Sequence, residues 1–401
     1  MGWDHGLGPA GAVLFWASLG AVVYVYIGYP VILSAAARLK GRAVRRGECL
    51  PSVTVLIAVH NEEAHIRRRL ENLLSADYPA DRLRVLVGCD GCTDGTEAAA
   101  REFSGDRVTV VSFPERRGKA AVLNRLLTRA DSEVVLFADA RQVYDPQAIR
   151  RLMRSFADPE VGGATGSVVV DGRGTAAEGV GLYRRYDEYL RRKESELFST
   201  LGAAGAIYAL RRKLCGPLPE DTVLDDFVMP MRAVARGYRV VYEPEARAYD
   251  IPPASVGHEV RRKARTLAGN YQALWRLRAM LLPGRSRVWW QTASHKLGRL
   301  LVPFAMIGCA VGAMCAAFAK PDYWSAVAAQ SAFYLAALGG WVCARWGLNV
   351  PGLGLAFMFV AMNWAALLGF WRFVRGGQPV TWERTYAGAA ACEPAVHPPE
   401  R

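Results

Sequence analysis

The sequence predicts an α/β domain with a mostly parallel sheet, joined to transmembrane helices. Residues 51–158 alternate short β-branched or apolar runs with stretches of helical periodicity, the pattern of a parallel sheet with helices on both faces. Four segments lack any charged side chain, namely 6–37, 300–319, 323–344 and 346–371. Because a bilayer core takes about 20 apolar residues in helical form, each of these segments is long enough to span it.

The first apolar segment ends in a cluster of basic residues at positions 38, 40, 42, 45 and 46. The positive-inside rule keeps such a cluster in the cytoplasm, so the residues after it should also be cytoplasmic. We therefore expect a membrane anchor at 1–37, a basic linker at 38–50 and a cytoplasmic domain at 51–284, in an integral protein of a bacterial-type plasma membrane. A cleaved signal peptide is the alternative for 1–37, but this segment lacks a basic start and exceeds the apolar stretch of about 7–15 residues found in such peptides.

The C-terminal part begins with aromatic and basic residues that are typical of a membrane surface. Trp289 and Trp290 are followed by Lys296 and Arg299, so we expect an interfacial helix at 285–299. Three membrane segments over 300–371 and a tail at 372–401 complete the chain. One span before the domain and three after it would place the tail outside, although the arginines at 372, 375 and 384 favour the inside. The side of the tail therefore stays open.

The overall charge fits a membrane enzyme better than a nucleic-acid-binding protein. The 401 residues carry a net charge of +13, and the isoelectric point is near 9.5. Such a charge suits an anionic bilayer surface or a substrate that bears phosphate. No recognised nucleic-acid-binding motif accompanies the charge, so nucleic acid is not an expected partner.

The α/β elements follow one another in order. We expect strands at 51–61, 83–90, 107–114 and 132–140, each a short run rich in β-branched or other apolar residues. We expect helices at 62–77, 95–104, 118–130 and 145–158. In the first of these, Ile66, Leu70, Leu73 and Leu74 have helical spacing, and in the last, Pro146 follows Asp145 at the start.

Polar residues follow three of these strands at their carboxyl ends. Asn61 and Glu62 follow the first strand, Asp90 and Asp94 the second, and Asp139 the fourth. Ligands of open parallel sheets bind beyond the carboxyl ends of the strands, so these residues predict a site for metal and phosphate or for ribose. Each aspartate alone is explained as well by a helix cap or a turn. The sequence lacks the phosphate loop of ATPases and the glycine fingerprint of dinucleotide dehydrogenases, which argues against both classes.

The second strand also carries a C-x-x-C pair, Cys89 and Cys92. A zinc site would need two more ligands, and neither a second C-x-x-C nor a histidine pair is present. A disulfide framework is not expected in a reducing cytosol. We interpret the pair as incidental to the turn that carries Asp90.

Six stretches in order resemble the membrane-bound family 2 glycosyltransferases, the group that includes cellulose, hyaluronan and poly-N-acetylglucosamine synthases. They are HNEE at 60–63, CDGCTDGT at 89–96, RRGKAAVLN at 116–124, FADA at 137–140, LDDF at 224–227 and RRKAR at 261–265. Residues 194–212 and 294–303 also resemble the non-cellulose bacterial branch. The resemblance implies a GT-A fold, in which a Rossmann-like nucleotide half joins an acceptor half. It also implies inverting transfer from a UDP-sugar to a lipid-linked or growing glycan acceptor.

The resemblance assigns the donor site to four residues of the nucleotide half. Glu62 and Asp90 stand where the family's carboxylates bind uridine, and Lys119 is placed to meet phosphate. Asp139 matches the first acid of the D-x-D motif, which binds Mg²⁺ or Mn²⁺. Arg141 occupies the place of the second acid. Either Asp139 and the diphosphate hold the metal together with water, or Arg141 itself supplies the positive charge.

The resemblance also assigns the chemistry of the acceptor half. Asp226 matches the last acid of the T-E-D motif, the general base that removes the acceptor's hydroxyl proton, whereas Asp225 can cap the following helix. Arg265 keeps the arginine of Q-x-x-R-W, whose fork could hold the diphosphate. Arg262 replaces the glutamine, and Thr266 replaces the tryptophan that is prominent in processive polymerases. Single and repeated addition therefore both stay open.

Two other function classes compete with the enzyme. A catalytically inactive relative that scaffolds a membrane assembly is suggested by Arg141 and Thr266, whereas retention of Asp226 speaks for catalysis. A transporter is disfavoured because most of the chain is α/β with acidic strand ends. The sequence identifies neither the donated sugar nor the acceptor.

Overall fold

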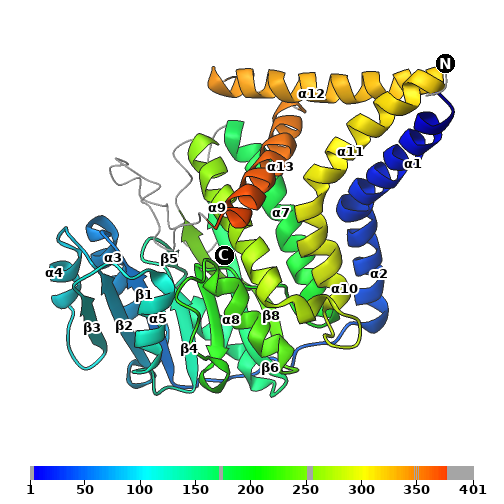
Figure 1. The fold of residues 1–401 in the computed structure, drawn as a ribbon. Coiled ribbons are helices and arrows are strands. Elements are labelled where there is room, and N and C mark those ends of the chain that lie inside the picture. The colour runs from blue at the N-terminus through cyan, green and yellow to red at the C-terminus, as the bar shows by residue number, and fades with distance from the viewer. Residues whose placement is uncertain are drawn as a thin grey trace.

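The computed structural model describes residues 4–170, 175–250, 256–346, 348, 350 and 352–376 (Figure 1). Its centre is one eight-stranded sheet in the order β3-β2-β1-β4-β7-β6-β8-β5. The strands are β1 Val53–Val59, β2 Leu83–Asp90, β3 Val108–Phe113, β4 Val134–Ala138, β5 Val143–Tyr144, β6 Val161–Val170, β7 Ile207–Arg211 and β8 Arg239–Asp250. The predicted alternation of strands and helices in an α/β domain is confirmed.

The half of the sheet that contains β1 to β4 is fully parallel. Strand β1 pairs with β2 on one side and with β4 on the other, and β2 pairs with β3. Every residue of β1 is buried, because both faces of the sheet are covered by helices. Val55 and Ile57 face one hydrophobic core, together with α3 (Glu63–Leu74), α4 (Thr96–Arg101) and α6 (Ala148–Met153). Leu56 and Ala58 face a second core with α5 (Lys119–Leu127) and α8 (Asp225–Ala235).

The other half of the sheet is mixed. Strand β7 runs antiparallel to both β4 and β6, and β5 runs antiparallel to β8, whereas β6 and β8 are parallel. Two long helices follow β6 and β8, namely α7 (Thr175–Leu197) and α9 (Val256–Arg276). In Figure 1 both rise from the sheet toward the apolar helices. They therefore connect the sheet with the apolar helices.

Four helical segments in the described part of the chain are long and apolar enough to cross a bilayer: Gly8–Lys40, Trp289–Ala319, Pro321–Arg345 and Leu353–Val374. The first consists of α1 (Asp4–Val23), a π-helical turn (Tyr24–Gly28) and α2 (Tyr29–Lys40). Helix α1 packs closely against α11 (Gly298–Ala319). A Cβ atom on Gly312 of α11 would lie 2.5 Å from the backbone nitrogen of Phe15, so only glycine allows this approach.

The segment expected as an interfacial helix continues directly into the next apolar helix. Residues 289–319 form one helix through α10 (Trp289–Gln291), a π-helical stretch (Thr292–Leu297) and α11. Its place at a membrane surface stays a prediction.

The last apolar helix returns to the catalytic domain. Helix α12 (Trp324–Arg345) leads to α13 (Leu353–Val374), and α13 packs along α9. A Cβ atom on Gly369 would lie 2.9 Å from the backbone nitrogen of Ala268, and Phe370 and Phe373 both contact the ring of Tyr271. In Figure 1 the red end of α13 lies beside the sheet, whereas α12 lies at the far ends of α11 and α13. The tail therefore starts next to the catalytic domain.

Candidate active site

The parallel strands carry three of the expected site residues to one edge of the sheet. Ile57 of β1 is in register with Ala138 of β4, and Val59 is in register with Cys89 of β2. Glu62, Asp90 and Asp139 therefore stand at or just beyond the carboxyl ends of three adjacent strands, where parallel sheets bind ligands.

Asp90 holds a loop of the protein itself. Its side chain is buried, and its two carboxylate oxygens accept hydrogen bonds from the backbone amides of Arg117 (2.6 Å) and Gly118 (2.9 Å). Gly118 has a φ of +93°, which favours glycine, and it directly precedes Lys119 at the start of α5. Asp90 thus fixes the loop that positions Lys119. Its expected contact with uridine stays a prediction.

The loops after β1 and β2 are tied together around Glu62. The side chain of Asn61, whose φ is +56°, accepts a hydrogen bond from the amide of Thr93 at 2.8 Å. Glu62 is partly exposed, and its Oε2 lies 2.9 Å from Nδ1 of His65. Asp94 accepts a hydrogen bond from the amide of Thr96 at 3.0 Å, which makes it a turn residue. Glu62 remains available at the strand end.

Lys119 connects the nucleotide half with the acceptor half. Its Nζ lies 3.0 Å from Oδ1 of Asp139 and 3.2 Å from Oδ1 of Asp225. Burial lowers the pKa of Lys119, but attraction by Asp139, Asp225 and Asp226 outweighs this effect and holds the pKa above its usual value. The second oxygen of Asp225 accepts a hydrogen bond from the Tyr208 hydroxyl at 2.8 Å. Asp225 is therefore a buried anchor.

Asp226, the expected general base, lies beside this cluster at the start of α8. Burial and the neighbouring charge of Asp225 raise the pKa of Asp226 to about 6, while Lys119 and Lys296 oppose this rise. A carboxylate with this pKa is mostly ionised at neutral pH and is still basic enough to take a proton.

Arg265 and Arg262 of α9 bring positive charge to the same place. Burial lowers the pKa of Arg265, although attraction by Asp225, Asp226 and Asp139 partly compensates, and an arginine stays charged in proteins. Its Nε is buried and has no hydrogen-bond partner within the residues that the structure describes. Arg262 and Thr266 line the same cavity as Asp226. Six of the expected residues thus converge: Lys119, Asp139, Asp225, Asp226, Arg262 and Arg265.

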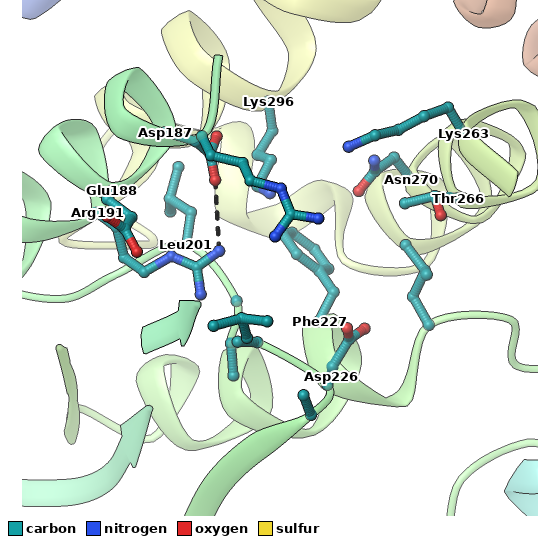
Figure 2. A pocket seen from close by; sticks show the side chains of 18 of the residues that line it. Asp187, Glu188, Arg191, Leu201, Asp226, Phe227, Lys263, Thr266, Asn270 and Lys296 are labelled. Atoms are coloured by element: carbon teal, nitrogen blue, oxygen red, sulfur yellow. Dashed lines mark hydrogen bonds and ion pairs between the residues drawn. The ribbon is translucent and has the colours of Figure 1, made fainter. Parts of the chain in front are cut away.

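A cavity of about 450 Å³ extends from Asp139 and Asp226 toward the apolar helices (Figure 2). Its walls come from the loop 201–206, from α7, from α9 and from the helical stretch that includes Lys296. In Figure 2, Asp226 and Phe227 form one side, while Lys263 and Lys296 extend into the space above them. Helix α13 contributes Met362 and Ala366. This space can therefore hold a ligand that contacts both Asp226 and the apolar helices.

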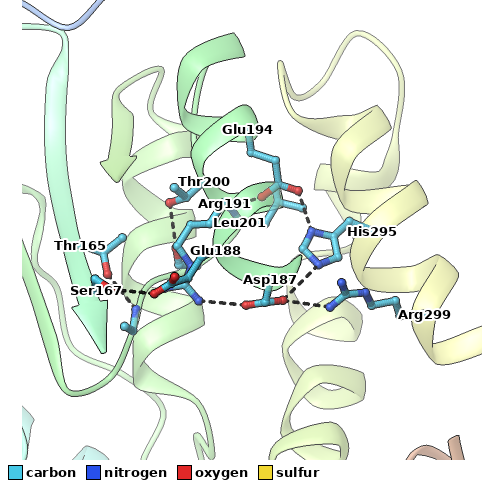
Figure 3. A network of polar contacts seen from close by, with 12 residues as sticks. Thr165, Ser167, Asp187, Glu188, Arg191, Glu194, Thr200, Leu201, His295 and Arg299 are labelled. Carbon is cyan, nitrogen blue, oxygen red and sulfur yellow. Dashed lines mark hydrogen bonds and ion pairs between the residues drawn. The ribbon is translucent and has the colours of Figure 1, made fainter. Parts of the chain in front are cut away.

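The membrane side of the cavity contains a polar network that sequence analysis missed (Figure 3). Asp187 of α7 lies 3.0 Å from NH1 of Arg299 and 3.4 Å from NH2 of Arg191. Glu194 lies 2.6 Å from Nδ1 of His295 and accepts a hydrogen bond from the Tyr29 hydroxyl at 2.7 Å. The available signal was indirect, because Glu194 and His295 belong to two stretches that resemble known relatives but suggest no partner.

The acids of this network are held in their ionised form. Burial alone would raise the pKa of Asp187, but Arg299, Arg191 and His295 hold it well below its usual value. Burial likewise opposes ionisation of Glu194, and the contacts with His295 and Tyr29 lower its pKa nevertheless. The network therefore ties α2, α7 and the helix that leads into α11 together through charge.

Comparison with known proteins gives the family. Residues 51–269, more than half of the chain, match the model of "Glycosyltransferase like family 2". The chain belongs to this family. The GT-A-like fold and the enzyme class of glycosyltransferase follow from this membership and from the structural likeness below.

This glycosyltransferase is distantly similar to known polysaccharide synthases. It is 25% identical over 235 residues to the poly-beta-1,6-N-acetyl-D-glucosamine synthase of Staphylococcus aureus, which covers 57% of this chain and 56% of that enzyme. It is 24% identical over 232 residues to the synthase of the same name from Staphylococcus epidermidis, over 56% of each chain. The matched part thus spans just over half the length of these relatives.

A solved structure shares the fold of nearly the whole glycosyltransferase. The mannosyltransferase PcManGT of Pyrobaculum calidifontis, solved with GDP-mannose and Mn²⁺, matches with a TM-score of 0.69 and 23% sequence identity. The match covers 90% of this chain and 99% of that one. The likeness includes the long apolar helices as well as the GT-A-like domain.

The glycosyltransferase offers a divalent metal only a sparse set of ligands. Across the described residues, no three His, Cys, Asp or Glu side chains gather in a way that could hold an ion. The side chain of Asp139 is 41% exposed and can supply one carboxylate. Arg141 forms two hydrogen bonds with Asp250, of 2.8 and 2.9 Å, so this carboxylate balances its charge. The residues present therefore fit a metal held by Asp139 together with oxygens of a diphosphate.

The C-x-x-C pair of this glycosyltransferase packs against the first strand. Cys89 is buried in the hydrophobic core, and Sγ of Cys92 lies 3.7 Å from the carbonyl oxygen of Val59. The contact with Cys89 lowers the pKa of Cys92 to about 7, although burial opposes this. Cys89 precedes Asp90 at the end of β2, and Cys92 lies in the turn that follows the strand.

Proposed function

We propose that the protein transfers a sugar with inversion from a UDP-sugar to a hydroxyl of a membrane-associated or growing glycan, in the synthesis of a cell-surface or extracellular polysaccharide. The observation that carries this proposal is the position of Asp226. It lines the cavity and lies beside a cluster that contains Lys119 and Arg265. A base and cations for a diphosphate are thus present together.

Asp226 acts as the base in this proposal. Its carboxylate accepts the proton of the acceptor hydroxyl while the oxygen attacks the anomeric carbon. The bond between that carbon and the diphosphate breaks on the opposite side, so an α-linked donor gives a β-linked product. Asp225 contributes by raising the pKa of Asp226 and by holding Lys119.

The leaving diphosphate is stabilised by positive charge. Lys119 meets it as a point charge, and the buried guanidinium of Arg265 can hold it with paired hydrogen bonds. A bound Mg²⁺ or Mn²⁺ at Asp139 would neutralise further charge on the diphosphate. The Mn²⁺ in the complex of the similar mannosyltransferase supports a divalent ion in this role. Glu62 and Asp90 remain our candidates for the nucleoside end.

We infer that the reaction takes place at the cytoplasmic face of a plasma membrane. The basic cluster at 38–46 directly follows α2, and such clusters stay in the cytoplasm. The polysaccharide synthases to which the chain is similar support a glycan product. In this proposal α11 and α13 cross the bilayer and α12 lies across their far ends (Figure 1). The tail then starts on the cytoplasmic side, because α13 ends beside the catalytic domain.

The test is the release of UDP from purified full-length protein given a panel of UDP-sugars, with GDP-mannose included. We expect turnover of at least one donor, and we expect Asp226→Asn to lower it by about 10²–10⁴-fold, the usual contribution of a general base. Binding of UDP should survive in this variant. Asp106→Asn, which makes the same change at an exposed loop residue, is the control.

Two outcomes would contradict the enzyme proposal. Turnover by Asp226→Asn at the wild-type rate would remove Asp226 from the chemistry. Binding of nucleotide without turnover of any donor, at every metal ion and acceptor offered, would favour the scaffold function instead.

A further inference from the structure

The cavity leads from the catalytic base to side chains of the apolar helices. Its lining includes Tyr26 from the turn between α1 and α2, together with Met362 and Ala366 of α13. Asp226 lines the same space (Figure 2). A ligand that fills the cavity therefore contacts the base and segments expected in the bilayer at the same time.

The membrane end of this cavity is strongly basic. Apart from the charged residues near the base, namely Asp139, Arg141, Asp226, Asp250 and Arg262, the lining holds five basic and two acidic side chains. The basic ones are Arg184, Arg191, Lys263, Lys296 and Arg299, and the acidic ones are Asp187 and Glu188. Such an excess of positive charge attracts an anion more strongly than it attracts a neutral glycan.

Lys296 is the most telling of these cations. It extends into the cavity in Figure 2 and lies over the ring of Phe227, with Nζ 5.2 Å from the ring centroid. Within the described residues, it forms no ion pair with a carboxylate at 4.0 Å or less. A half-buried ammonium group without a hydrogen-bonded anion is unfavourable, so an anionic ligand would stabilise it.

We propose that the acceptor is a lipid-linked sugar whose phosphate binds at this membrane end, against Lys296, Arg191 and Lys263. The proposal rests on the proposed function. The sugar then reaches Asp226, and the hydrocarbon chain leaves between the apolar helices near Tyr26 and Met362. A lipid phosphate suits the site because it joins an anionic group to a chain that belongs in the bilayer.

The transfer step leaves this phosphate unchanged. The acceptor hydroxyl gives its proton to Asp226 and its oxygen bonds to the anomeric carbon of the donor, while the bond from that carbon to UDP breaks. A phosphate could itself act as nucleophile, but it is already mostly deprotonated at neutral pH and needs no base. The presence of Asp226 therefore favours a hydroxyl as the reacting group, with the phosphate as its anchor.

The donor's own diphosphate is the alternative anion for this site. Lys119 and Arg265, the cations that we assign to the donor, do not belong to the lining of the cavity, whereas Lys296, Arg191 and Lys263 do. Two separate groups of cations are thus available for two separate phosphates. An experiment with the donor site filled distinguishes these sources.

The experiment measures binding of farnesyl phosphate and of farnesol to the full-length protein in zwitterionic nanodiscs with saturating UDP. The two probes share one hydrocarbon chain and differ in the phosphate. We expect farnesyl phosphate to bind about tenfold or more tightly than farnesol, because charge-assisted hydrogen bonds to the phosphate are stronger than the neutral hydrogen bonds of the alcohol. Lys296→Gln should remove most of this preference, and Lys296→Arg should keep it.

A matched control is available on the same helix. Lys320 is exposed directly after α11, so Lys320→Gln removes the same charge without touching the cavity and should leave the preference unchanged. Retained UDP affinity shows that Lys296→Gln is folded. If that variant fails to bind UDP, Arg191→Gln serves as the second test of the same site.

Three results would overturn the proposal. Equal binding of farnesol and farnesyl phosphate would show that the phosphate is not recognised. Displacement of farnesyl phosphate by UDP would assign these cations to the donor, and an unaffected Lys296→Gln would exclude Lys296. Failure of the proposed function looks different, because the wild type would then turn over no sugar whether or not farnesyl phosphate binds.

Discussion

Two clusters of buried charged residues border the cavity, and they shift the pKa values of their carboxylates in opposite directions. In the catalytic cluster, Lys119 faces Asp139, Asp225 and Asp226, and the pKa of Asp226 is raised to about 6. In the membrane-side cluster, contacts with Arg299 and Arg191 for Asp187, and with His295 and Tyr29 for Glu194, outweigh burial, and the pKa values of both acids are lowered.

The difference in pKa indicates that the first cluster takes part in the chemistry and that the second holds helices together. A carboxylate whose pKa lies near neutrality can exchange a proton during turnover, whereas one whose pKa is far below neutrality stays charged. The first cluster is therefore suited to catalysis. The second is suited to holding α2, α7 and the start of α11 in one arrangement, and variants on the two sides should have different effects.

After Asp226→Asn, the largest effect is expected for Lys119→Gln in the catalytic cluster. The variant removes a positive charge from the leaving diphosphate, and loss of one such preorganised contact lowers turnover by about 10²–10³-fold. It also removes a charge that lowers the pKa of Asp226, so the acid limb of the pH profile should move upward. Steady-state kcat/KM measured against pH tests both effects.

The matched control for this variant is Lys213→Gln, an exposed lysine of the same domain. It should leave kcat/KM within about twofold, as surface substitutions usually do. Turnover by Lys119→Gln at the wild-type rate would show that the catalytic cluster does not need its central cation, and it would contradict the difference between the two clusters.

The pH dependence of the wild type is expected to be the next largest effect. Asp226 acts as a base only when it is ionised, so kcat/KM should be constant above its pKa of about 6 and fall as the pH drops below it. The decrease should approach about tenfold for each pH unit, as expected for one essential ionised group. UDP release measured from about pH 4.5 to about pH 8, with UDP binding followed in parallel to show that the protein stays folded, tests this. If kcat/KM did not change with pH over this range, the raised pKa of Asp226 would have no part in the mechanism.

The catalytic side was predictable from the sequence because its residues follow strand ends. The order of β1, β2 and β4 in the sheet brings Glu62, Asp90 and Asp139 to one edge without any knowledge of long-range packing. Asp226 and Arg265 came from resemblance alone. The sequence could not reveal which groups hydrogen-bond to each carboxylate oxygen. Asp90 holds the amides of Arg117 and Gly118, an arrangement that only the fold brings about.

The membrane side was not predictable, because its partners lie far apart in the chain. Tyr29, Glu194 and His295 come from three separate segments, and each has an ordinary local explanation when taken alone. Arg141 is similar, since its partner Asp250 stands 109 residues further along. The open question of the tail also depended on packing. The contact of Phe373 with Tyr271 places the end of α13 beside the catalytic domain, which the sequence alone could not show.

The smallest effect is expected for Glu194→Gln in the membrane-side cluster, and it should concern stability. Gln keeps the shape of the side chain and can still accept one hydrogen bond, but it loses the charge that strengthens the contacts with His295 and Tyr29. A charge-assisted hydrogen bond exceeds a neutral one by about 1 kcal/mol, so we expect a loss of roughly 1–2 kcal/mol in the free energy of unfolding. Thermal unfolding of the full-length protein measures it.

The pH dependence of stability gives this variant a distinct signature. Because the folded-state pKa of Glu194 is lowered, its contribution is present at neutral pH and is lost as the pH falls through that pKa. The stability gap between wild type and Glu194→Gln should therefore narrow in acid. Glu196→Gln, two residues along α7 and partly exposed, should change the unfolding free energy by less than about 0.5 kcal/mol, because exposed ion pairs contribute little. An equal loss in both variants would mean that helix α7 is sensitive to any change of charge. It would contradict the specific role of the Glu194 contacts in holding α2, α7 and the start of α11 together.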